Sequence, residues 1–157
     1  MSDSFVRDLR AAGAAGTPIV LVVTHEEARL RALVSAAFPG TRVLDWTVTC
    51  GWSDGESACE ALAGVAAASR AGEAGVTRIM FDLHPWLDDP RVVRALRDLA
   101  AVPRETPLVL VMPAAKLPPE LDRDASVLTL PLPGVSEVGA AFDAVLAGSG
   151  VRWPRDQ

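Results

Sequence analysis

The sequence predicts an α/β fold in which a five-stranded parallel sheet lies between two layers of helices. Five short apolar segments have the character of buried strands, and they alternate along the chain with segments of helical periodicity. This alternation favours parallel strands joined by helical crossovers, which gives a doubly wound, three-layer architecture. With 157 residues the chain has the size of one domain, so we expect a single domain over 1–157 with its core at about 5–147.

The strands are predicted from apolar runs that are bounded by proline and glycine. The first run, PIVLVV, is continuously apolar, which is typical of a strand that is covered on both faces. The second, TRVLDWTV, is rich in residues that favour extended backbone. In chain order, the five predicted strands cover 17–23, 41–48, 76–83, 107–112 and 126–130.

The helices are predicted from apolar spacing and from their start and stop signals. Pro39-Gly40 and Pro103 end two of them, and Ser136 is the expected N-cap of the last. Residues 50–55 are predicted to form a loop, and 116–124 a short irregular or helical stretch. The predicted helices cover 4–12, 26–37, 57–70, 91–101 and 136–147.

Composition argues against two classes of partner. The net charge is −5 and the basic residues are scattered, so the electrostatic footprint of a nucleic-acid binder is missing. No apolar run reaches the length of a membrane span, and the first residues lack the apolar core of a signal peptide. We therefore expect a cytoplasmic protein without nucleic-acid or membrane contacts, in which Cys50 and Cys59 are free thiols.

The turn after the first strand lacks the chemistry of a phosphate-binding loop. Such a loop uses glycines, whose backbone can turn its N–H groups onto a phosphate, together with a lysine. Here the turn is Thr24-His25-Glu26, without glycine or lysine, and Glu26 and Glu27 place acids where the helix dipole would otherwise attract an anion.

Taken in order, several segments resemble the core of AAA ATPases. They are PIVLVVTHEEARLRAL, VLDWTVTCGW, IMFDLHPWLDD, VVRALRDLA and PLVLVMPAAKLPPELDRDASVLTLPLPG, and they cover most of the chain. The arrangement is most similar to the degenerate N-terminal domain of bacterial and plastid FtsH-like AAA proteins. This resemblance implies a P-loop NTPase-like strand order 5-1-4-3-2 without a lid domain.

The resemblance also implies what has been lost. Asp82 matches the aspartate that positions magnesium in active modules, which makes it a vestigial Walker-B-like residue. Leu83 stands in place of the catalytic glutamate, and Met112-Pro113 replaces the polar sensor. Because phosphoryl transfer depends on these parts, we expect no enzymatic activity, no catalytic residue, no cofactor and no bound metal.

The expected function is therefore a non-catalytic protein-interaction or regulatory module, with an AAA ATPase or further copies of itself as partner. Two alternatives stay open: a receiver-like signalling domain with Asp82 as phosphoacceptor, and a small-molecule or nucleotide-binding domain with a non-standard loop. Ligands and partners of such sheets bind at the carboxyl edge of the strands. Candidate partner-surface residues there are Trp52, Trp86, Asp88, Asp89, Met112 and Lys116. For the tryptophans, the alternative is that they close the top of the core.

Overall fold

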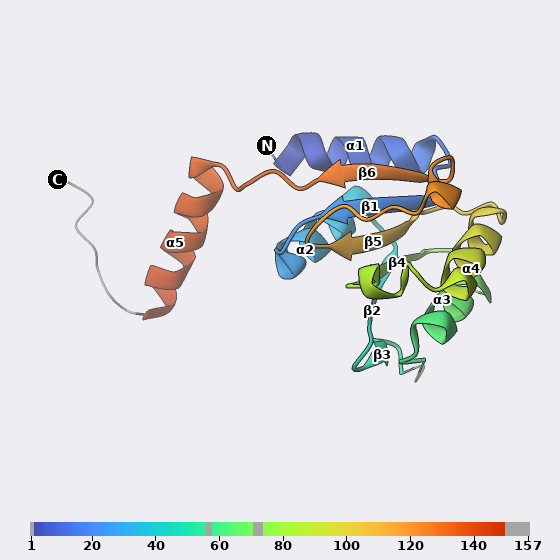
Figure 1. The fold of residues 1–157 in the computed structure, drawn as a ribbon. Helices are drawn as coiled ribbons and strands as arrows, with labels where there is room; N and C mark the ends of the chain where they lie inside the picture. The colour runs from blue at the N-terminus through green and yellow to red at the C-terminus, as the bar shows by residue number, and fades with distance from the viewer. Residues whose placement is uncertain (1, 56–57, 71–73, 150–157) are drawn as a thin grey trace.

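The computed structural model describes residues 2–55, 58–70 and 74–149, and these form a helix-covered sheet (Figure 1). The strands are β1 (Ile19–Val23), β2 (Arg42–Thr47), β3 (Gly51–Trp52), β4 (Val76–Phe81), β5 (Leu108–Met112) and β6 (Ala125–Thr129). The helices are α1 (Ser2–Ala14), α2 (Glu27–Ala37), α3 (Ala61–Arg70), α4 (Pro90–Ala100) and α5 (Val135–Ser149). Two short 3-10 helices, η1 (His84–Trp86) and η2 (Pro119–Leu121), lie in the connections. The predicted α/β class is confirmed.

The sheet has six strands in the order β3-β2-β4-β5-β1-β6. Five of them run parallel, and these correspond to the five strands predicted from the sequence. The expectation of a wholly parallel five-stranded sheet is wrong, because β3 adds an antiparallel strand at the edge. Trp46 of β2 pairs with Trp52 of β3, so residues 51–52 of the predicted loop form the second strand of a short hairpin.

Strand order also removes the receiver alternative. A receiver places its first strand between the second and the third, whereas β1 here lies between β5 and β6, and β2 pairs with β4. Asp82 therefore does not sit in a receiver topology.

Alternate residues of each strand face two separate cores. Ile19 and Leu21 of β1 face the core that is completed by α3 and α4. Val20 and Val22 face the core that is completed by α1 and α2. These four side chains are fully buried, as the continuous apolar run predicts. The carboxyl ends of the parallel strands meet at one edge of this sandwich, and the candidate site residues follow them.

Two helix starts differ from the prediction. In the described part of the chain α3 begins at Ala61, while Ser57, its predicted start, lies outside the described residues. Ala58 precedes the helix, and its carbonyl accepts a hydrogen bond from Nε1 of Trp46 at 2.6 Å. Ser136 is not the N-cap of α5, because the helix already begins at Val135. The Gly134 N–H instead donates to Oε2 of Glu137 at 2.7 Å.

Candidate functional site

The turn between β1 and α2 is closed by its own side chains. Oγ1 of Thr24 accepts a hydrogen bond from the backbone N–H of Glu26 at 3.0 Å. The Glu26 carboxylate, at the start of α2, accepts from Nη1 of Arg29 at 2.6 Å. The same Nη1 donates to the carbonyl of Pro131 at 2.8 Å. The Arg29 guanidinium is thus engaged by an acid and a carbonyl, and a carboxylate lies where a phosphate-binding loop would present N–H groups.

Asp82 lies directly after β4 in an unusual backbone conformation. Its φ is +54°, in the left-handed region that residues other than glycine rarely adopt, although aspartate tolerates it. Its N–H donates to the carbonyl of Val111 at 2.9 Å, and its exposed carboxylate lies 3.8 Å from Nδ1 of His84. No group of three or more His, Cys, Asp or Glu residues in the described part of the chain is arranged to hold a metal ion.

Leu83 follows Asp82, at the position where an active AAA module would carry its catalytic glutamate. Its side chain is fully buried in the core shared with α3 and α4. The position that would carry a catalytic glutamate in an active module therefore contributes to packing here.

Trp52 and Met112 belong to the core and cannot serve as surface anchors. Trp52 is 3% exposed, donates from Nε1 to the carbonyl of Gly64 at 3.1 Å, and lies under the Arg78 guanidinium. Met112 is fully buried at the end of β5. For Trp52 the alternative of closing the core is correct, because its indole packs under α3. Of the two loop tryptophans, only Trp86 is partly exposed, packed against the edge of the same core.

The remaining candidates form two separate charge pairs. Asp88 is exposed and pairs with Nζ of Lys116 at 2.6 Å, which joins the loop before α4 to the loop after β5. Asp89 caps α4: its Oδ1 accepts from the Arg91 N–H at 2.9 Å, and its Oδ2 from Arg91 Nη2 at 2.7 Å. These hydrogen bonds to Arg91 lower the pKa of the Asp89 carboxyl. Both acids are therefore already partnered, and they do not form a free acidic rim.

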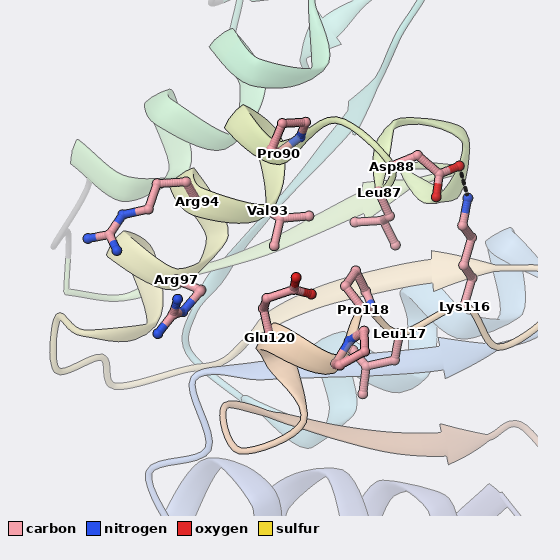
Figure 2. A pocket seen from close by; sticks show the side chains of 11 residues that line it. Leu87, Asp88, Pro90, Val93, Arg94, Arg97, Lys116, Leu117, Pro118 and Glu120 are labelled. Carbon is pink, nitrogen blue, oxygen red and sulfur yellow. Dashed lines mark hydrogen bonds and ion pairs between the residues drawn. The ribbon is translucent and has the colours of Figure 1, made fainter.

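The sequence did not predict a groove of about 580 Å³ between α4 and the segment that leads into η2 (Figure 2). Leu87, Val93 and Leu117 supply apolar contact surface. The Asp88–Lys116 pair lies at one end, and Arg94 and Arg97 lie at the other. The groove is further lined by Pro90, Pro118, Pro119 and Glu120. The prolines were a signal that this segment stays extended, but the sequence alone did not place it beside α4.

The end of the groove at Arg94 and Arg97 differs in charge from the end that carries the Asp88–Lys116 pair. Arg94 is held by Asp98 through an Nη2–Oδ1 contact of 2.5 Å, one turn further along α4. Arg97 lines the groove beside it. Figure 2 shows the guanidinium groups of Arg94 and Arg97 directed outward and the Glu120 carboxylate directed into the groove, so side chains of both charges line this end.

The two cysteines are free thiols, as expected. Cys50 is exposed, and hydrogen bonds from the hydroxyls of Thr49 and Thr47 lower the pKa of its thiol. Among the described helices, none combines the length and apolar character needed to cross a membrane.

The mostly parallel sheet between two helix layers defines an α/β domain whose fold is compatible with the Rossmann and P-loop-like classes. Over residues 5–130 the chain matches the model of the SpoVK-like AAA ATPase, N-terminal domain, and it belongs to this family. A search of curated proteins finds no match. The family match supports the AAA relationship that the sequence indicated, and it does not bear on the FtsH-like branch.

Proposed function

We propose that this domain is a non-catalytic interaction or regulatory module that acts with an AAA ATPase or a multiprotein assembly. The β1–α2 turn carries the proposal. At this position a nucleotide-binding relative would present glycine N–H groups and a lysine, whereas here Thr24, Glu26 and Arg29 satisfy one another. A triphosphate would have to displace the Glu26–Arg29 pair and then lie against a carboxylate.

Isothermal titration with magnesium-ATP tests the first half of this proposal. We expect no heat of binding and no phosphate release up to millimolar nucleotide, with an AAA module that retains its glycine-lysine loop as the positive control. A dissociation constant in the micromolar range would contradict it, because about 8 kcal/mol of binding would require a phosphate site that this turn does not provide.

The interaction surface that we propose lies at the carboxyl edge of the sheet. Three features support it: the partly exposed Trp86, the neighbouring Asp88–Lys116 bridge, and the groove that continues from that bridge along α4. Aromatic side chains at the centre of an interface often contribute most of its binding energy. Edge loops held by a rigid sheet are also where this class of fold places its sites.

Trp86→Ala tests this surface. We expect binding to the AAA module of a SpoVK-like protein to weaken by about 2 kcal/mol or more, which is roughly thirtyfold. Binding is measured at a temperature at which circular dichroism shows the variant to be folded, because Trp86 also packs on the core. Val102→Ala, an exposed substitution after α4, is the matched control. Equal affinities of the two variants would contradict the surface assignment.

A small-molecule function is the second candidate, and the groove favours it. Its volume of about 580 Å³ lies within the usual range of ligand pockets, and Arg97 lines one of its ends. The expected ligand has an apolar body and a carboxylate that pairs with Arg97 at the outer end of the groove, away from the Glu120 carboxylate (Figure 2). Arg97→Gln should weaken such a ligand tenfold or more, as measured by calorimetric titration. Unchanged ligand affinity in that variant would exclude this candidate.

A further inference from the structure

Helix α5 carries an exposed apolar seam. Val135, Val138, Phe142 and Val145 follow one another at intervals of three, four and three residues. Their exposed fractions are 93%, 53%, 53% and 69%. Alternating intervals of three and four place side chains on one narrow stripe, the spacing that pairs two helices in a coiled coil.

The base of α5 is fixed to the domain by its polar side. The Glu137 carboxylate accepts from the Gly134 N–H at 2.7 Å and lies 3.8 Å from Nη2 of Arg29. Arg29 also binds the carbonyl of Pro131 in the preceding segment. Glu137 follows Val135 by two residues, so its side chain points well away from the apolar seam. The seam is therefore directed away from this anchor, and α5 stands off from the sheet in Figure 1.

Charge and side-chain size along α5 fit a second helix of the same kind. The positions that flank the seam are Gly139, Ala141, Leu146 and Gly148, none of which is charged. The acids Glu137 and Asp143 lie off the seam, so two copies of this acidic chain would meet there without like charges between them. Small flanking residues also let two helix backbones approach closely.

No other described helix has an apolar face free to pack against this seam. Helices α1, α2, α3 and α4 each direct their apolar residues into the two cores. Among the described helices, α5 alone leaves its apolar seam exposed. A second copy presents the same seam, and a two-fold axis makes such a surface complementary to itself.

We propose that two copies of this chain associate through α5, seam against seam. The seam spans about one and a half heptads, so the contact is smaller than the roughly 1,200 Å² of a standard interface, and the dimer is weak and concentration-dependent. This inference is independent of the surface at the carboxyl edge of the sheet, and either can hold without the other.

Sedimentation velocity of the full chain, at concentrations from about 5 to 500 µM, tests the proposal. We expect a monomer–dimer equilibrium with a dissociation constant in the micromolar range. Phe142→Asp and Val138→Asp should each raise this constant at least tenfold. Ala140→Asp is the control, because Ala140 is exposed on the opposite side of the same helix and its replacement costs at least as much helix propensity as the seam substitutions.

Three outcomes would overturn the proposal. A wild-type chain that is purely monomeric at the highest concentration would show that the seam does not pair two copies. A dimer that withstands both seam substitutions would use a different surface. Equal dissociation by Ala140→Asp would show that helix stability, and not the seam, determines association. Circular dichroism confirms that each variant is folded, which is expected because the substituted side chains are exposed.

Discussion

At the scale of single residues, Gly64 determines how Trp46 and Trp52 pack against α3. It lies in α3, and its carbonyl accepts the indole N–H of Trp52. A Cβ atom added to it would lie 2.5 Å from Nε1 and 2.7 Å from Cε2 of Trp46, a fully buried ring. The absence of a side chain at this position therefore lets α3 approach the sheet over β2.

Gly64→Ala should consequently lower the free energy of unfolding by about 1–3 kcal/mol, the usual cost of overpacking a core. Urea denaturation followed by tryptophan fluorescence measures it. Gly139→Ala is the control: no atom lies within 4 Å of its added Cβ, and alanine favours helix. If Gly64→Ala were as stable as the wild type, the close contact between α3 and Trp46 would be wrong.

Asp82 lies where the resemblance places the Walker-B-like aspartate, and its backbone is strained. Because its φ is +54°, a β-branched residue fits poorly, whereas asparagine tolerates this conformation as aspartate does. Asp82→Val should cost about 1–3 kcal/mol of unfolding free energy and Asp82→Asn close to none, as measured in the same urea experiment. Equal losses in both variants would show that the carboxylate charge, and not the backbone, explains the aspartate.

At the scale of elements, the apolar runs were sufficient to place the five parallel strands. They could not reveal β3, because two residues are too few to show a period and the strand exists through its pairing of Trp52 with Trp46. Sequence position placed Trp52 and Met112 at the correct edge of the sheet but did not give the direction of their side chains. Both point into the core.

The groove beside α4 depends on contacts that no local pattern contains. The Asp88–Lys116 pair joins loops that lie 28 residues apart in the chain. In the sequence alone, Asp88 and Lys116 cannot be distinguished from ordinary solvated charges. For the same reason, the exposure of the α5 seam was not visible in its sequence, since an identical pattern buried against the sheet would have the same spacing.

The cap of α4 makes this helix sensitive to acid. Hydrogen bonds to Arg91 lower the pKa of Asp89 below its ordinary value of 3.8, so its contribution to stability is fully present above that value. It is lost as the pH falls through the lower folded pKa. Asp89→Ala should lower the melting temperature at pH 7, and the difference from wild type should shrink below about pH 4. Asp89→Asn, which retains a capping oxygen, should show a smaller loss at pH 7. A difference that does not change with pH would contradict the role of the charge.

At the scale of the whole molecule, stability is concentrated in the middle of the sheet. Residues Ile19–Val22 of β1 and Leu108–Leu110 of β5 are completely buried between the two helix layers. By contrast, α5 is joined to the domain at its base, where the Glu137 carboxylate lies 3.8 Å from Nη2 of Arg29, and the side chains of its seam are exposed. The molecule thus combines a sheet that is covered by helices with an appended helix that has little tertiary packing to stabilise it.

Hydrogen exchange should separate these two parts. In the dilute full chain we expect the amides of β1 and β5 to exchange only through global unfolding, and those of α5 to exchange roughly a thousandfold faster or more. Mass spectrometry of peptic fragments measures this, with the amides of α4 as an internal control, because α4 is a helix of similar length whose apolar face is buried. Raising the protein concentration should slow exchange in α5 while leaving β1 and β5 unchanged, since pairing protects only the appended helix. Exchange in the dilute chain that is as slow in α5 as in β5 would mean that the helix folds back onto its own sheet in solution. The seam would then be internal.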